Sequence, residues 1–305
     1  MPSVEKYRGR FAPSPTGPLH FGSLVCALAS FLDARHHHGQ WLVRIEDIDP
    51  PREIPGATHS ILNQLESHGL HWDGELLYQS QRSHAYNEAL EQLQQTGLLF
   101  SCDCNRQRIA ELGGIYDGCC RTRQSVTDAA LRLQVPDAQN GRIVFDDLIM
   151  GRYEQNLCCD VGDFVVKRRD GLISYQLAVT VDDQFQGISH IVRGADLLDS
   201  TPRQLYLQHC LSYHHSQSVT EAIHYAHLPL ATNAEGQKLS KQNHAAALPS
   251  GSEVDSLWFA LDWLRQAPPE DLRSESVATL LGWAIDNWVL GNIPAQMALP
   301  AGQDV

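Results

Sequence analysis

Residues 7–45 show the pattern of a strand, a loop, a helix and a second strand, and this unit constrains the fold more than any other part of the chain. Tyr7–Phe11 is the first strand candidate, and the helix expected over Leu19–His38 carries apolar residues at helical spacing before Gly39 ends it. Gln40–Ile45 ("QWLVRI") then has the composition of a buried strand. Strands that alternate with helices predict a parallel sheet covered by helices, with ligands bound beyond the carboxyl ends of the strands.

The rest of the chain changes pattern several times. A helix is expected near residues 56–68, and residues 100–125 interrupt the alternation with clustered Cys, Gly and Arg. Residues 141–195 are expected to be rich in strands, in "GRIVFDDLIMG", "FVVKRRDG" and "ISYQLAVTVDD", before "HIVRGADLL" returns to the main sheet. From about residue 250 the apolar spacing is helical. We therefore expect an α/β protein with a Rossmann-type parallel sheet, an insertion and a C-terminal helical region.

The segment "RFAPSPTGPLHFGS" before the first helix has the features of a phosphate-binding loop. Its prolines fix the backbone, and Gly17 and Gly22 leave room where backbone must approach a ligand. His20 stands at the start of the helix, where free N–H groups favour an anion. Far along the chain, "KLSKQ" places Lys238 and Lys241 three residues apart, which suits them to neutralise a polyphosphate.

The segment "SCDCNRQRIAELGGIYDGCCRTR" contains four of the eight cysteines. Cys102 and Cys104 lie in one turn, and Cys119 and Cys120 follow about fifteen residues later. Thiolates from two separate turns predict a tetrahedral structural zinc site. Adjacent Cys119 and Cys120 are not expected to bind the same ion together. The alternative is a set of reduced thiols, because a chain without a secretory signal is not expected to form disulfides.

Charge and hydropathy exclude several classes of protein. With 23 basic and 36 acidic residues the net charge is −13, which argues against unspecific binding to polyanions. Two interpretations of the clustered basic residues remain: a local track that binds RNA, or dispersed surface charge. These residues are Arg106, Arg108, Arg121, Arg123 and Lys167-Arg168-Arg169. No apolar run reaches the ~18–20 residues of a membrane span. We expect a cytoplasmic protein without a membrane partner.

Together these motifs resemble the class I aminoacyl-tRNA synthetases, and more specifically the catalytic cores of glutamyl-tRNA synthetases. "HFGS" stands in the place of the HIGH motif, and "KLSKQ" in that of the KMSKS motif. "RFAPSPTG", "VRIEDID", "YQSQR" and "ISYQLAVTVDDQFQGISHIVRGADLLDSTPRQ" look like the glutamate branch, to which Arg10 and Ser14 point. The resemblance covers about residues 8–245.

The resemblance implies a set of site residues. The glutamate-binding residues would be Arg10, Phe11, Ala12, Pro13, Ser14, Glu46, Tyr175 and Arg193. ATP, with Mg²⁺, would lie against His20, Gly22 and Lys241, and His20, Lys241 and Lys238 would act in catalysis. In a short subgroup of synthetase-like proteins the pattern of zinc ligands falls on Cys102, Cys104, Tyr116 and Cys120, although Cys119 could replace Tyr116 or Cys120.

The acceptor is implied by the same short subgroup, which the whole chain resembles. Only about 60 residues follow Gln242, so we expect no anticodon-binding domain. In that subgroup L-glutamate is activated with ATP, without tRNA, and transferred to the queuosine base in the anticodon stem-loop of tRNA(Asp). We expect such an enzyme, acting as a monomer. The alternatives are an idle RNA-binding or regulatory module, and a ligase that transfers glutamate to a carrier protein or small molecule.

Four regions are expected along the chain. They are the first half of the Rossmann catalytic domain (1–100), the zinc-containing insertion (101–170), the second half of the catalytic domain with the KMSKS-like loop (171–245), and the helical C-terminal region (246–305).

Overall fold

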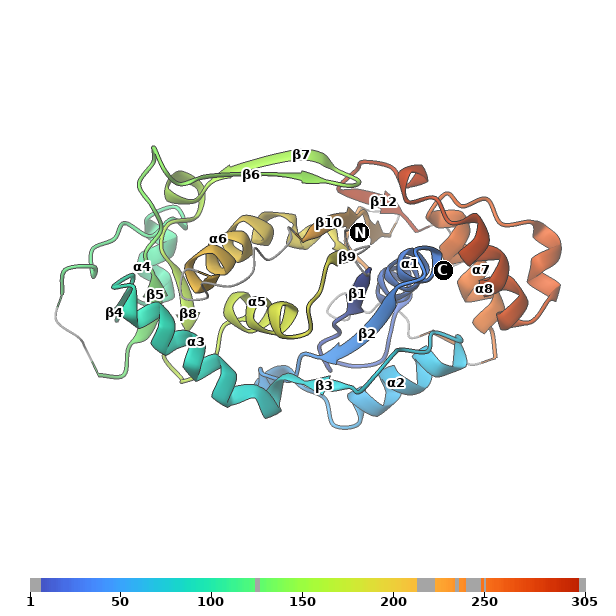
Figure 1. The fold of residues 1–305 in the computed structure, drawn as a ribbon, viewed down its shortest axis with the longest axis horizontal. Helices are drawn as coiled ribbons and strands as arrows, with labels where there is room; N and C mark the ends of the chain where they lie inside the picture. Colours follow the sequence, from blue (N-terminus) through green and yellow to red (C-terminus); the bar gives the residue numbers. More distant parts are fainter. Residues whose placement is uncertain are drawn as a thin grey trace, which may run out of the picture.

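Parallel strands form the centre of the fold (Figure 1). The computed structural model describes residues 7–123, 127–212, 223–233, 236–239, 248–249 and 251–301. The central strands are β1 (Arg8–Phe11), β2 (Gln40–Ile45), β3 (Leu77–Tyr78), β9 (His190–Gly194) and β10 (His224–Leu228). β1 pairs with β2, β2 with β3, and β9 with β10, all in parallel. The strands expected at the N-terminus and the return to the main sheet at "HIVRG" are therefore confirmed.

The two groups of strands meet at β1 and β9. Ser189, just before β9, donates its backbone N–H to the Arg8 carbonyl oxygen at 3.0 Å, and its hydroxyl accepts the Arg8 N–H at 2.9 Å. The spatial order is therefore β3-β2-β1-β9-β10. The predicted α/β class is confirmed. From β1 the chain continues to β2 and β3 on one side of the sheet, whereas β9 and β10 lie on the other side. The strand order therefore reverses between β1 and β9, and α/β sheets bind their ligands at such a switch point.

The first helices follow the sequence pattern closely. α1 (Phe21–His36) connects β1 to β2 and packs against the sheet on one side and the C-terminal helices on the other, which explains why it is apolar almost all round. His37 caps its C-terminus, and Gly39 follows in the turn to β2, where a Cβ would lie 2.4 Å from the Tyr7 carbonyl oxygen. α2 (Ala57–Ser67) is the helix expected near 56–68.

The stretch between β3 and β9 folds around a second, antiparallel sheet of β4, β5 and β8. Its elements are α3 (Ser83–Gln95), β4 (Leu99–Cys102), α4 (Arg106–Glu111), β5 (Ala130–Leu133), β6 (Arg142–Asp147), β7 (Gly151–Asn156) and β8 (Phe164–Lys167). β6 and β7 form a hairpin that runs from this insertion back toward the centre (Figure 1). There β6 pairs in parallel with β10, with Asp147 opposite Tyr225.

Residues 173–183 ("ISYQLAVTVDD") are not a strand, so that expectation is wrong. They lie largely in helix α5 (Tyr175–Phe185), which begins after Ser174, whose hydroxyl accepts the Leu177 N–H at 3.3 Å. Val and Thr favour strands by propensity, but capping and tertiary contacts override this preference. Those contacts include those of Asp182 and Asp183, which are both buried.

The C-terminal part packs onto α1. It follows α6 (Thr201–Ser212), and its elements are β11 (Leu230–Thr232), α7 (Glu253–Trp263), α8 (Val277–Asn287) and β12 (Ala298–Pro300), with β11 and β12 paired in parallel. The indole N–H of Trp288 donates to Asp33 Oδ1 of α1 at 2.9 Å, and Tyr7 donates its hydroxyl to the other oxygen. Within the described ranges, no helix is long and apolar enough to cross a membrane.

Candidate active site

A cavity of about 580 Å³ opens at the carboxyl ends of β1, β2 and β9. Arg10 lies near the end of β1, Glu46 directly follows β2, and Arg193 lies near the end of β9, so one edge of the sheet carries all three. The structure brings together in this cavity all the residues that the resemblance implied for glutamate binding, namely Arg10, Phe11, Ala12, Pro13, Ser14, Glu46, Tyr175 and Arg193.

Two buried arginines share one carboxylate in the wall of this cavity. Arg10 donates through Nε to Asp183 Oδ1 at 3.1 Å, and Arg44 donates through Nη1 to the same oxygen at 2.8 Å. Burial alone would raise the pKa of Asp183, but the two guanidinium groups hold it below its usual range. Asp183 therefore stays charged and fixes the orientation of Arg10. The sequence analysis identified neither Arg44 nor Asp183.

A chain of buried hydrogen bonds orients Arg193. Its Nε donates to His227 Nε2 at 3.0 Å, and its Nη2 donates to Thr201 Oγ1 at 2.8 Å and to Gln204 Oε1 at 2.9 Å. Because a guanidinium can only donate, His227 Nε2 must accept, so the ring proton lies on Nδ1 and is donated to Asp147 Oδ2 at 2.6 Å. Burial lowers the pKa of His227, which favours this neutral ring.

Arg193 and Glu46 both line the cavity. Arg193 Nη1 lies 3.5 Å from the Tyr175 hydroxyl. The Glu46 side chain is 9 % exposed and lies 3.6 Å from Arg44, yet among the described residues its Oε1 has no hydrogen-bond partner. Burial raises the pKa of Glu46 to about 7, although Arg44 and Arg10 lower it. Guanidinium groups beside a carboxylate whose Oε1 accepts no hydrogen bond in the described part of the chain fit a zwitterion with an additional acid group.

His20 caps the first turn of α1, which borders the same cavity. Its Nδ1 accepts the Ser23 N–H at 3.4 Å, and the Ser23 hydroxyl accepts the His20 N–H at 2.8 Å. A Cβ on Gly22 would lie 3.2 Å from the His20 ring, so a side chain would crowd the start of the helix. The residues expected to meet ATP phosphates are thus at a helix N-terminus, where backbone N–H groups attract anions.

Of the two lysines of "KLSKQ", Lys238 lies within the described residues and Lys241 does not. Lys238 lines the cavity and forms an ion pair with Asp196. A bridge between Thr232 and Lys238 holds this segment alongside β11. Lys241 lies outside the described residues, so its expected place beside the α-phosphate stays a prediction.

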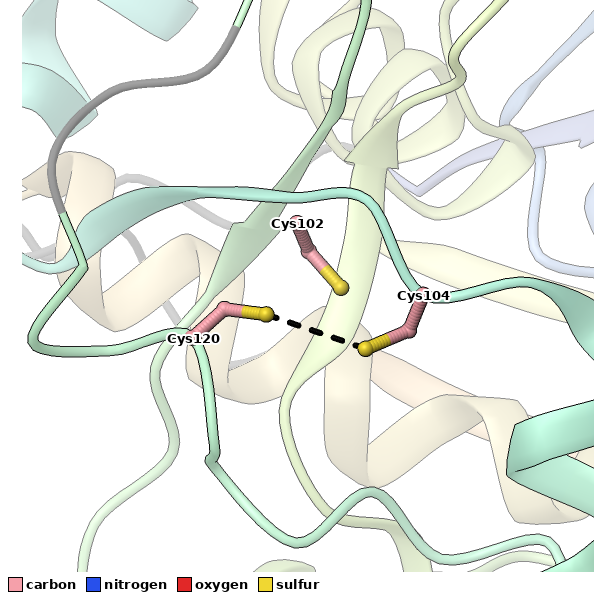
Figure 2. A group of neighbouring side chains, drawn as sticks. All are labelled: Cys102, Cys104 and Cys120. Atoms are coloured by element: carbon pink, nitrogen blue, oxygen red, sulfur yellow. Dashed lines mark hydrogen bonds between the residues drawn. The ribbon is translucent and has the colours of Figure 1, made fainter.

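Three cysteines of the insertion point toward one another (Figure 2). Cys102 ends β4, Cys104 follows two residues later, and Cys120 comes from the loop after α4. Their sulfur atoms all lie within 4.8 Å of one another, and those of Cys104 and Cys120 are 3.7 Å apart. Thiolates about 2.3 Å from a tetrahedral zinc ion are about 3.8 Å apart. The three cysteines could therefore hold a metal ion.

Both candidates for a fourth ligand lie beside these three sulfurs. The Cys119 sulfur is 3.7 Å from those of Cys104 and Cys120. The Tyr116 hydroxyl is 3.6 Å from the Cys119 sulfur and accepts the Cys120 N–H at 2.9 Å. Adjacent Cys119 and Cys120 thus turn their sulfurs toward the same space, and Tyr116 and Cys119 both lie beside the three sulfurs.

Most of the arginines in the proposed basic tracks are paired with carboxylates. The pairs are Arg108–Asp117, Arg121–Asp163, Arg123–Asp103, and Arg168 with both Asp49 and Asp170. This pairing favours dispersed, compensated charge over a continuous RNA-binding track.

The overall fold is that of known glutamate-specific synthetases. The glutamate-tRNA synthetase of Elizabethkingia anophelis superposes with a TM-score of 0.80 at 24% identity, over 98% of this chain and 69% of that one. A glutamate tRNA ligase of Elizabethkingia meningosepticum, solved in complex with its amino acid, gives 0.79 at 24% identity over 98% and 68%.

Residues 6–257 match the family "tRNA synthetases class I (E and Q), catalytic domain", so the switch-point cavity and the capped helix lie in the catalytic domain of a class I aminoacyl-tRNA synthetase. Proteins described as glutamyl-Q tRNA(Asp) synthetases are 52% identical in Cronobacter sakazakii, 51% in Dechloromonas aromatica and 49% in Pseudomonas fluorescens. These matches cover 97% of this chain and 96%, 99% and 97% of the relatives. The chain belongs to the glutamyl-Q tRNA(Asp) synthetase family.

Proposed function

We propose that this protein activates L-glutamate with ATP and transfers the glutamyl group to the queuosine base of tRNA(Asp). The observation that carries the first half is the cavity in which Asp183 and His227 orient two buried arginines beside Glu46, whose Oε1 accepts no hydrogen bond from a described residue. The second half is supported by about 50% identity, over nearly the whole chain, to relatives named for that product.

Each side chain has a proposed role in binding glutamate. Arg10 and Arg193 bind its carboxylates, since a guanidinium forks onto a carboxylate with two parallel hydrogen bonds. Glu46 takes the α-ammonium, and Tyr175 together with residues 11–14 lines the rest of the pocket.

ATP binds at the start of α1 in this proposal. His20 and Gly22 hold its phosphates, Mg²⁺ accompanies them, and Lys238 and Lys241 stabilise the charge of the transition state. A glutamate carboxylate oxygen attacks the α-phosphorus, and the bond to pyrophosphate breaks as the new P–O bond forms. Positioning and electrostatics supply most of the rate enhancement in such a displacement.

Glutamate binding should depend on pH through Glu46, whose burial raises its pKa to about 7. A protonated Glu46 cannot pair with the α-ammonium, so KM for glutamate should rise as pH falls below 7, by up to about tenfold per pH unit. The measurement is KM in glutamate-dependent ATP–pyrophosphate exchange between pH 6 and 8. Glu46→Gln should bind weakly and show a flat profile, and a profile like that of the unsubstituted enzyme would assign the titration to another group.

We also propose one structural zinc ion, bound by Cys102, Cys104, Cys120 and Tyr116. Cys120→Ser should lose the zinc and destabilise the insertion, because a metal-bound loop depends on its ion for folding free energy. Tyr116→Phe should lower zinc occupancy, whereas Cys119→Ser should retain it. The measurement is metal content by mass spectrometry after dialysis, together with thermal melting.

Cys210→Ser is the matched control for this zinc series. Cys210 is a buried cysteine of α6 outside the cluster, so its serine variant should keep the full metal content. Loss of zinc from Cys119→Ser but not from Tyr116→Phe would move the fourth ligand to Cys119.

Two half-reactions test the proposed function. The purified protein should catalyse glutamate-dependent ATP–pyrophosphate exchange without tRNA, and should attach labelled glutamate to queuosine-containing tRNA(Asp) but not to tRNA(Asp) lacking that base. Absence of exchange would favour an idle RNA-binding or regulatory module. Exchange without transfer to queuosine would favour a ligase with another acceptor.

The proposal includes the compartment and the oligomeric state of the protein. We propose that the protein acts in the cytoplasm, where its proposed tRNA acceptor is found, and that it acts as a monomer. The region boundaries and the lack of an anticodon-binding domain in residues 246–305 stay predictions.

A further inference from the structure

A second cavity of about 220 Å³ adjoins the first. The two share the wall residues Ser14, Thr16, Glu46, Arg52 and Tyr175. The smaller cavity is also lined by Gln79 from the "YQSQR" motif and by residues of β8 and of the segment before α5. His20 and Lys238, which are proposed to meet ATP, line the larger cavity and not this one.

Three side chains with buried acceptor oxygens line the smaller cavity. Among the described residues, Oε1 of Glu46, of Glu53 and of Gln79 is buried and has no hydrogen-bond partner. Gln79 is 1 % exposed, and its amide nitrogen donates to Asp182 Oδ2 at 2.8 Å, which fixes the other end of the amide as the oxygen. A buried acceptor without a donor is destabilising, so the wall of this cavity suits an occupant that supplies donors.

The charge of the cavity wall points to a cationic occupant. Asp49, Arg52 and Arg168 also line it, and both arginines are paired with carboxylates, Arg52 with Asp49 and Arg168 with Asp49 and Asp170. Glu53 forms no ion pair with a described residue, and burial together with nearby carboxylates raises its pKa. A positively charged group with N–H donors would relieve both the missing hydrogen bonds and the repulsion.

We infer that this cavity binds the side chain of the acceptor base, an inference that rests on the function proposed above. Queuosine carries a secondary ammonium group and, beyond it, a cyclopentene ring with two neighbouring hydroxyls. The ammonium meets Glu53 and Gln79, and one hydroxyl reaches the wall that the two cavities share at Glu46 and Tyr175. Guanosine lacks this side chain, so it would leave the acceptor oxygens without donors.

The shared wall also gives the transfer step its geometry. The hydroxyl oxygen attacks the carbonyl carbon of the glutamyl adenylate and forms an ester bond. The bond between that carbon and the phosphate oxygen breaks, AMP leaves with the electron pair, and the hydroxyl proton passes to solvent. Because ATP and the acceptor would enter from different cavities, the glutamyl adenylate can stay in place while the hydroxyl arrives.

Glu53→Gln tests the inference, because it keeps the shape of the side chain and removes its charge. We expect KM for queuosine-containing tRNA(Asp) to rise roughly tenfold or more, as for the loss of one charged hydrogen bond, with a much smaller effect on pyrophosphate exchange. Free queuine base should inhibit transfer by the unsubstituted enzyme, whereas guanine should not, and Glu53→Gln should weaken this inhibition.

Glu66→Gln is the matched control, because Glu66 is an exposed carboxylate on α2. It should leave both half-reactions unchanged. Transfer by Glu53→Gln at the normal KM would overturn the inference, and an equal loss in both half-reactions would assign the cavity to glutamate or ATP instead. If the unsubstituted enzyme exchanges pyrophosphate but glutamylates no queuosine, the proposed function itself fails.

Discussion

Arg193→Lys should lower kcat/KM for glutamate in pyrophosphate exchange by roughly a thousandfold, which corresponds to about 4 kcal/mol. Lysine cannot fork onto a carboxylate, and it leaves His227, Thr201 and Gln204 without the donors that Arg193 provides. Most of the loss should appear in KM, because the arginine acts in binding. The measurement is a glutamate titration of exchange at saturating ATP.

Variants of His227 test whether glutamate binding depends on the orientation of Arg193 as well as on its charge. His227→Gln can keep an acceptor near the place of Nε2, whereas His227→Leu cannot, so the leucine variant should lose more affinity for glutamate. Arg273→Lys, in an exposed cluster with Asp255 and Glu270, is the control and should have normal kinetics. A normal KM for Arg193→Lys in a folded enzyme would remove Arg193 from the glutamate site.

Asp183→Asn should lower the free energy of unfolding by about 3 kcal/mol, and Tm by roughly 8 °C. Asparagine keeps the size of the side chain but leaves the buried guanidinium groups of Arg10 and Arg44 without their shared charge. The measurement is denaturant unfolding at pH 7, where the carboxylate is ionised in both the folded and unfolded states.

The pH dependence of the stability loss in Asp183→Asn tests whether the missing negative charge causes it. The pKa of Asp183 is lowered in the folded state, so its stabilisation is present above the ordinary pKa of about 4 and is lost as pH falls through the folded value. The difference between the two proteins should therefore shrink in acid. Asp255→Asn, which removes an exposed partner of Arg273, is the control and should lower the free energy of unfolding by less than about 1 kcal/mol. Equal losses from Asp183→Asn and Asp255→Asn would contradict the role of burial in the Asp183 ion pairs.

The first strand, helix and second strand were predictable because their signals are local. Apolar spacing, a proline-rich loop and Gly39 define β1, α1 and β2 without reference to the rest of the chain. Arg10, Glu46 and Arg193 were placed by the resemblance, and the sheet brings them together because the ends of neighbouring parallel strands meet at one edge.

The groups that orient these residues were not predictable, because their contacts join distant segments. Asp183 lies in a stretch expected to be a strand, and its partner Arg10 is 173 positions away. His227 and Asp147 are 80 positions apart and meet only because β6 pairs with β10. No local spacing in the sequence carries that information. The cysteines of the insertion were predictable as a group, since they gather within about twenty residues of each other.

The β6–β7 hairpin has a consequence for engineering chimaeras of these enzymes. It belongs to the inserted segment, yet Asp147 at its inner end accepts the proton that sets the tautomer of His227. The insertion therefore cannot be exchanged without regard to the amino-acid pocket. A replacement segment must carry an aspartate at this position. Without it, His227 loses the hydrogen-bond acceptor that fixes its tautomer, and Arg193 loses its fixed orientation.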